Sequence, residues 1–179
     1  MHPLAHFITI TRHRHLVCRY CFRLGLYGQG LLHDLSKYSP TEFLSGAKYY
    51  QGDRSPNDAE RKAEGVSRAW LHHKGRNRHH FEYWIDYCIQ PDGSVTMGGN
   101  EMPIKYVAEM FCDRVAACRV YMKDKYTDAS AYEYFARSRH RIMMHEKTKA
   151  ELEKMLTVLK DEGEEAAFAY VRRRLRSGK

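Results

Sequence analysis

Hydrophobic residues recur along most of this chain at intervals of three and four residues, which is the spacing of amphipathic helices. The first such segment runs from Leu4 to Leu24, where Ile10, Val17 and Tyr20 fall on one face. Gly25 follows, and glycine commonly ends a helix. The sequence therefore predicts one long N-terminal helix.

Two shorter helices are predicted next. One is expected to hold the run from Gly30 to Lys37. The second is expected to run from Pro40 to about Tyr50, because Ser39 suits an N-cap and Pro40 suits a first helical turn. Glu42 stands where a capping box places its acidic residue.

The middle of the chain has a more broken pattern. Residues 52–57 are a predicted loop, and the helical stretch that starts at Pro56 is expected to continue through Trp70 to a break at Gly75. A further helix, with an aromatic face, is predicted over residues 81–89.

The C-terminal half begins with a predicted long loop over residues 91–102, which contains three glycines. Pro103 then opens a strongly amphipathic helix. Its inward stripe consists of Tyr106, Met110, Asp113, Ala117 and Tyr121. Residues 130–176 are predicted to form two or three helices with a break near Gly163.

The composition supports this helical interpretation. The chain has 179 residues, of which 43% are hydrophobic and 12% aromatic, so one domain with a sizeable core is expected. Glycine and proline are sparse. We therefore predict an all-α fold that forms a single compact helical bundle.

The formal net charge of +8 favours contact with phosphates, nucleic acids or anionic membrane surfaces. The basic residues are scattered, however, and the one dense run is Arg172–Arg174 with Arg176. A solvated terminal helix is the favoured interpretation of that run.

Five cysteines occur without a disulfide framework, which favours a reducing, cytoplasmic location. Cys18 and Cys21 form a C-x-x-C inside a predicted helix, without a second pair, and are interpreted as packing residues rather than zinc or redox ligands. No apolar run approaches the roughly 20 residues needed to cross a bilayer, so no membrane association is expected.

The candidate chemistry lies in ionisable residues at positions that should face inward. His33 and Asp34 follow two leucines, and a buried carboxylate is costly unless it is paired or bound to a metal. Asp113 lies within an apolar helical stripe, and Arg114 points about 100° away around the helix. His13 shares the inward face of the first helix.

Each of these residues also has an ordinary structural explanation. A His-Asp pair can be a hydrogen-bonded core pair or a helix cap, and one inward histidine is more often a satisfied core residue than a ligand. The combination changes this assessment, because His13, the pair His33-Asp34, and Asp113 lie on three separate predicted segments. A shared metal ion explains all of them together.

The order His, His-Asp, Asp resembles the ligand order of the HD phosphohydrolase superfamily. The run from Leu32 to Lys37 is similar to its H-D-x-x-K segment, and the run from Asp113 to Ala117 is similar to its final aspartate helix. The resemblance implies an HD-type bundle over residues 1–145, with helices of 146–179 packing on the same domain. It also implies a metal site of His13, His33, Asp34 and Asp113.

A closer resemblance is to an uncharacterised bacterial family, catalogued as a domain of unknown function related to HD proteins. It rests on four stretches of the chain, namely residues 11–13, 30–43, 70–84 and 109–117. This resemblance favours His13 over His15 as the first ligand and implies no established activity.

A histidine-rich turn follows the predicted helix that carries Trp70. HD proteins with two or three metals insert extra histidines at this place, so His73 and His80 are candidate ligands of a second metal, with His72 and His79 as alternates. Asp34 would then bridge the metals. A polar turn that contacts only solvent or substrate is the alternative. The expected cofactor is one or two divalent transition metals, namely Mn, Fe, Ni, Co or Zn.

The resemblance implies a metal-dependent phosphohydrolase that acts on a phosphorylated small molecule or nucleotide through a metal-activated water. Asp34 and Lys37 are the candidate catalytic residues. The candidate substrate-binding residues are Lys37, Lys74, Arg76 and Asn77.

Two alternative functions remain open. One is a metal-binding or oxygenase-type HD protein without hydrolase activity. The other is a basic nucleic-acid-binding module, which is disfavoured because no binding motif is present and the basic residues do not gather on one predicted face.

Overall fold

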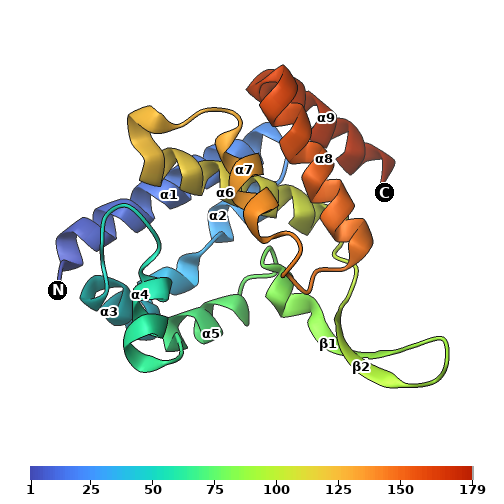
Figure 1. Ribbon diagram of the computed structural model, residues 1–179. Helices are drawn as coiled ribbons and strands as arrows, with labels where there is room; N and C mark the ends of the chain where they lie inside the picture. The colour runs from blue at the N-terminus through green and yellow to red at the C-terminus, as the bar shows by residue number, and fades with distance from the viewer. Residues whose placement is uncertain (179) are drawn as a thin grey trace.

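The computed structural model describes residues 1–178 and has an all-α fold with one small β-hairpin (Figure 1). The helices are α1 (Pro3–Arg23), α2 (Tyr27–Leu32), α3 (Pro40–Lys48), α4 (Pro56–Glu64), α5 (Arg68–Lys74), α6 (Ile104–Met122), α7 (Ser130–Ser138), α8 (Glu146–Glu162) and α9 (Glu164–Ser177). Short 3-10 helices are η1 (Leu35–Tyr38), η2 (Phe81–Trp84) and η3 (Lys123–Lys125). The hairpin consists of β1 (Ile85–Ile89) and β2 (Val95–Gly99).

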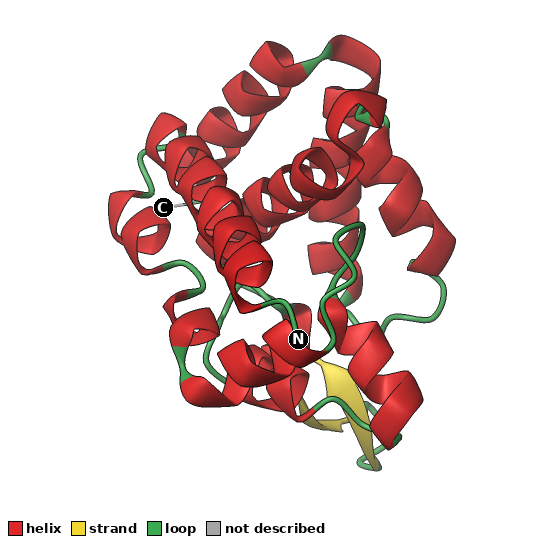
Figure 2. Ribbon diagram, turned by 90° about the vertical axis from the view of Figure 1, so that its left-hand side faces the viewer, coloured by secondary structure: helices red, strands yellow, loops and turns green. Residues whose placement is uncertain are grey.

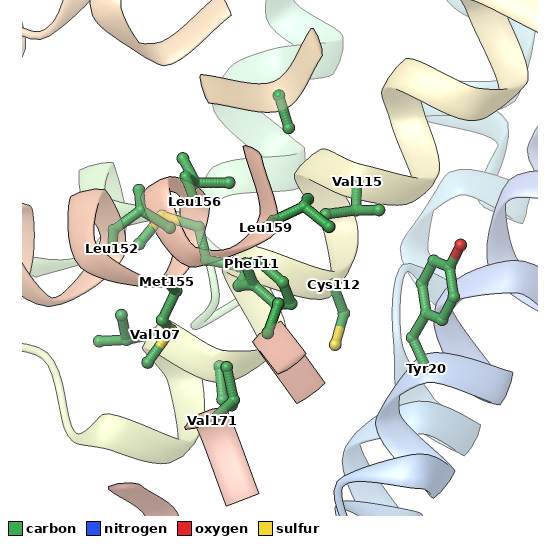
Figure 3. Packing of buried hydrophobic residues seen from close by; sticks show 14 of the residues in the cluster. Tyr20, Val107, Phe111, Cys112, Val115, Leu152, Met155, Leu156, Leu159 and Val171 are labelled. Atoms are coloured by element: carbon green, nitrogen blue, oxygen red, sulfur yellow. The ribbon is translucent and has the colours of Figure 1, made fainter. Parts of the chain in front are cut away.

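The apolar core lies where α6 packs against α8 and α9 (Figure 3). Phe111 on α6 is fully buried and meets Phe168 of α9 edge to face, with ring centroids 5.7 Å apart. Leu152, Leu156 and Leu159 supply the α8 side of this core. Burial of these side chains anchors α6, and α6 carries part of the polar site on another of its faces.

The N-terminal half packs around α1, which contacts α2, α3 and α6, while α3 contacts α5. Figure 2 shows these helices from a second side. Gly30 allows the close approach of α2 to α1, since a Cβ at this position would lie 3.0 Å from the Cβ of Cys21. This packing brings the turn after α2 against α1.

The long helices agree with the sequence pattern. The helix predicted over Leu4–Leu24 is α1, and Gly25 after it has a φ of 77°, which suits glycine. The amphipathic helix predicted after Pro103 is α6. The predicted break near Gly163 separates α8 from α9.

The predicted helix over Gly30–Lys37 is wrong. Helix α2 ends at Leu32, and η1 begins only at Leu35. Asp34 between them has φ 53° and ψ 24°, a left-handed conformation that breaks the helix. Aspartate tolerates this conformation better than most residues because its short side chain bonds locally.

The middle of the chain also departs from the prediction. The stretch from Pro56 to Gly75 is two helices, α4 and α5, because Gly65 adopts a φ of 76° and ends the first. The helix predicted over residues 81–89 is instead η2 followed by β1. Residues 91–102, predicted as a loop, contain β2. Aromatic and β-branched residues favour strands. The helical interpretation did not consider that β1 could pair with β2.

Strands β1 and β2 pair antiparallel, with Ile85 opposite Gly99 and Ile89 opposite Val95. The hairpin projects from the helical body (Figure 1). Tyr87 is 71% exposed on it.

Helices α8 and α9 belong to the segment that was predicted to pack on the same domain, and both contact α6. Residue 179, the last of that segment, lies outside the described residues. Within residues 1–178, no helix is both long and apolar enough to cross a membrane.

Candidate metal centre

Four predicted metal ligands come together in one buried group. His13 projects from α1, His33 and Asp34 from the turn between α2 and η1, and Asp113 from α6. One donor atom from each lies within 4.8 Å of the others, so together these atoms can hold a metal ion. We call this set, His13, His33, Asp34 and Asp113, group A.

The donor atoms of group A face one another. His13 Nε2 lies 3.0 Å from Asp113 Oδ1 and 3.7 Å from Asp34 Oδ2. His33 Nε2 lies 3.4 Å from Asp34 Oδ2 and 3.7 Å from Asp113 Oδ1. His15, the disfavoured alternative to His13, is exposed and lies outside the group.

A second group contains Asp34 again, with His73 from α5 and His79 and His80 from the turn after it. Their donor atoms also lie within 4.8 Å of one another. We call this set group B. Asp34 Oδ1 lies 3.2 Å from His73 Nε2 and 3.4 Å from His79 Nε2, while His73 Nε2 and His80 Nε2 are 2.9 Å apart.

Asp34 therefore turns one carboxylate oxygen to each group, as a bridging ligand would. The prediction named His73 and His80 as second-site ligands and His79 as an alternate, and all three lie in group B. The other alternate, His72, lies outside both groups, and its Nδ1 is 2.6 Å from Glu42 Oε1.

Several of these donor atoms are buried without a hydrogen-bond partner among the described residues. They are His13 Nε2, His33 Nε2, His79 Nε2 and both carboxylate oxygens of Asp34. Buried polar atoms in proteins almost always have a partner, and unmet ones indicate a missing water or ion. Their concentration around Asp34 fits a metal centre at that point.

The turn that carries His33 and Asp34 is held from α1 by Arg14. Its Nε donates to the carbonyl oxygen of His33 at 2.7 Å, and its Nη2 donates to that of Leu31 at 3.1 Å. These bonds satisfy carbonyls that the end of α2 leaves free. Arg14 thus fixes the backbone from which both site residues project.

Glu109 on α6 supports one histidine of each group. Its Oε1 lies 2.9 Å from His33 Nδ1 and 3.2 Å from His79 Nδ1. Imidazoles that bind metals commonly donate their second N–H to a carboxylate, which fixes the tautomer and leaves Nε2 free. Glu109 fills that role for both rings.

Glu42 makes the matching contact on the other side of group B. Its Oε2 lies 2.7 Å from His73 Nδ1. The predicted capping box is therefore wrong, since Ser39 is the N-cap residue of α3 but caps no backbone N–H with its side chain. Glu42 is buried and contacts imidazoles from α5 instead.

The charges in this centre are strongly coupled. Burial opposes ionisation of Asp34 and Asp113, but neighbouring histidines, and Lys37 beside Asp34, hold the pKa of both carboxyls well below its usual range. Burial also opposes protonation of His33, but Asp34, Asp113 and Glu109 raise its pKa to about 10. A metal ion that binds His33 therefore displaces a proton.

The remaining predicted site residues have different surroundings. Lys37 Nζ lies 3.2 Å from Asp34 Oδ2. Asn77 is buried, and its Nδ2 donates to the carbonyl oxygen of His73 at 2.8 Å and to Ser36 Oγ at 2.9 Å. Lys74 is partly buried, and Arg76 is exposed. Substrate binding by these residues stays a prediction.

Comparison with protein families gives one match, which covers residues 2–158 and therefore most of the chain. It is a family of unknown function, DUF5662. The chain belongs to this family. Searches of curated proteins and of solved structures found no match. Membership of DUF5662 agrees with the predicted uncharacterised family, whereas the link to HD proteins has no support from these comparisons.

Three supporting residues were not identified from the sequence, namely Arg14, Glu42 and Glu109. Each contacts a residue more than fifteen positions away, and the distance in sequence hides such pairs. Glu109 alone carried a signal. It lies one helical turn before Asp113 on α6, so the two carboxylates face the same side of that helix.

Proposed function

We propose that this protein is a metal-dependent phosphohydrolase of the HD type, which cleaves a phosphate ester. The observation that carries the proposal is the position of Asp34, whose two buried oxygens face different sets of imidazoles and have no hydrogen-bond partner among the described residues. This is the arrangement expected of a carboxylate that bridges two cations.

The donors of both groups fit divalent transition metals. Group A offers two imidazoles and two carboxylates, and group B offers three imidazoles and shares Asp34. Nitrogen and carboxylate donors suit Mn, Fe, Co, Ni or Zn, whereas an all-oxygen set would suit Mg or Ca. Such ions, when bound, lower the pKa of a coordinated water and polarise a phosphoryl oxygen.

Lys37 is the residue best placed to orient a phosphate. It lies against Asp34, yet its side chain is 30% exposed, so it touches both the centre and solvent. Burial opposes its charge, but Asp34 raises the pKa of Lys37 above its usual value, so the ammonium group stays protonated. A fixed cation beside the ligands can hold a phosphate oxygen in line for attack.

Asp113 marks the open side of the centre. Its side chain is 17% exposed, whereas Asp34 and His33 are almost completely buried. A substrate would therefore approach group A past Asp113 and Lys37. The buried imidazoles behind Asp34 keep the ligands in position and exclude water.

The test joins metal analysis to an activity screen. Freshly purified protein is expected to contain one to two transition-metal ions per chain, and to hydrolyse at least one member of a panel of phosphomonoesters and phosphodiesters with Mn, Co, Ni or Fe. The matched variant is Asp34→Asn, because asparagine also tolerates the left-handed backbone at this position and keeps the side-chain size.

Asp34→Asn is expected to abolish both metal content and hydrolysis while the circular dichroism spectrum stays helical. Metal content that survives this substitution would remove the basis of the centre. Full metal content without hydrolysis of any ester in the panel would reject the hydrolase and leave a metal-binding protein.

A further inference from the structure

A second polar feature lies outside the metal centre, in a groove of about 430 Å³ between α1 and the end of α6. It is lined by Arg12, His15, Leu16, Arg19, Arg119, Val120 and Lys123. Four of these residues are permanent cations and one is a histidine, and no acidic residue among residues 1–178 lines the groove. We call it the basic groove.

Three of its cations have no ion-pair partner among the described residues. Within residues 1–178, no carboxylate lies at ion-pair distance from Arg12, Arg19 or Lys123. Arg119 is different, because its Nη2 lies 2.6 Å from Glu164 Oε2. Like charges that share a concave surface repel one another and raise the local concentration of anions.

The backbone at Lys123 adds to this arrangement. Lys123 follows α6 with φ 51° and ψ −121°, a conformation that residues with a side chain rarely adopt. This change of backbone direction ends the helix at Met122, and Lys123 lines the groove. Such conformations persist where the surrounding structure holds them and gather at ligand-binding positions.

The basic groove is separate from the metal centre but lies on the same two helices. His13 points inward from α1 and is buried, while its neighbour Arg12 and the nearby His15 are exposed. Figure 1 shows α1 and α6 crossing, and the two helices pack directly on each other. A ligand in the groove would therefore bind across the contact between α1 and α6, the two helices that carry His13 and Asp113.

We propose that the basic groove binds a small molecule with several phosphate groups, at a site distinct from the metal centre. Arginine side chains form paired hydrogen bonds with phosphate oxygens, and Leu16 and Val120 line the groove with apolar atoms that the rest of the ligand can contact. The groove is a local hollow rather than an extended stripe, which favours a small ligand over a nucleic-acid backbone.

The test is calorimetric titration of inorganic triphosphate into the full-length protein at low salt. Binding is expected both in the wild-type chain and in Asp34→Asn, because the groove contains no metal ligand. The double variant Arg12→Ala with Arg19→Ala is expected to weaken binding about tenfold or more, since two charged contacts are lost. Both residues are exposed, so the fold is expected to survive.

The matched control is Lys62→Ala with Arg141→Ala, which removes the same charge from exposed positions outside the groove. Equal weakening in this control would overturn the site, because it would show a nonspecific charge effect. Loss of binding in Asp34→Asn would place the phosphates at the metal centre instead. Tighter binding of a ten-residue single-stranded oligonucleotide than of triphosphate would reject the small ligand.

Discussion

Two faces of α6 place the same helix in opposite chemical surroundings. Phe111 and Val115 point into a core of hydrocarbon that α8 and α9 complete. Glu109 and Asp113 point toward imidazoles from α1, the turn after α2, and the histidine-rich turn. The apolar face is complete with protein atoms alone, whereas buried atoms of His33, His79 and Asp34 opposite the polar face have no hydrogen-bond partner among the described residues. The apolar face therefore stabilises the fold, whereas the polar face is suited to binding a ligand.

The largest effect is expected from a change to the apolar face. Phe111→Ala would leave a cavity beside Phe168, and the free energy of unfolding is expected to fall by about 3–5 kcal/mol. Urea denaturation measures this loss. The metal content per folded chain should be unchanged, and a parallel loss of metal would show that the two faces are not independent.

Removal of metal with a chelator tests the polar face of α6. A ligand present at a thousand times its dissociation constant stabilises a protein by about 4 kcal/mol, so chelation is expected to lower the melting temperature markedly. Hydrogen exchange should quicken in α5 and in the turn at Asp34, while amides of α8 stay protected. Uniform deprotection of both regions would contradict a division between the faces.

A smaller effect is expected from a change at Glu109, the carboxylate that contacts the candidate ligands His33 and His79. Glu109→Gln keeps the size of the side chain but removes the negative charge that accepts hydrogen bonds from the two imidazole N–H groups. The metal affinity should therefore weaken about 10- to 100-fold. Competition with a coloured chelator measures the affinity. The control is Glu133→Gln, an exposed carboxylate on α7 that should change nothing.

The stability of the metal-free protein is expected to depend on pH through His33. The pKa of His33 is about 10 in the metal-free protein but about 6.5 in an unfolded chain, so its protonation stabilises the fold below about pH 6.5 and this contribution is lost as the pH rises toward 10. Between pH 7 and 9, the metal-free protein should lose about 1 kcal/mol of stability per pH unit.

The metal-loaded protein should be nearly insensitive to pH over the same window, because a bound ion has already displaced the proton from His33. Urea denaturation at pH 7, 8 and 9, with and without chelator, gives both slopes. Parallel slopes would mean that His33 does not contact the ion.

The smallest effect is expected from His15→Ala. This histidine lies close to His13 in sequence but is exposed and points into the basic groove. Metal content and melting temperature should both stay within error of wild type. His13→Ala provides the contrast, since it removes a donor of group A and should reduce metal content.

The residues of group A that interrupt a regular pattern could be identified from the sequence. His13 and Asp113 replace apolar residues on helical stripes, and such substitutions are visible without a structure. The hairpin was missed because the aromatic run before Ile89 satisfies a helical pattern as well as a strand pattern. Only pairing with Val95, across a turn, decides between the two.

The supporting residues were missed for a different reason. Glu42 matches a local capping pattern, yet its actual partner His73 lies on another helix. The packing of α3 against α5 decided this, because the buried imidazole of His73 needs an acceptor more than an exposed helix start does. Sequence patterns record local preferences, and this contact is not local.

The divided carboxylate of Asp34 has a consequence for how ions enter the centre. Rotation of this one side chain moves Oδ1 and Oδ2 together, so any adjustment that improves the fit of one cation shifts the donor offered to the other. Two equivalents of metal should therefore load in distinguishable steps, and a titration curve for identical, independent sites should fail to fit.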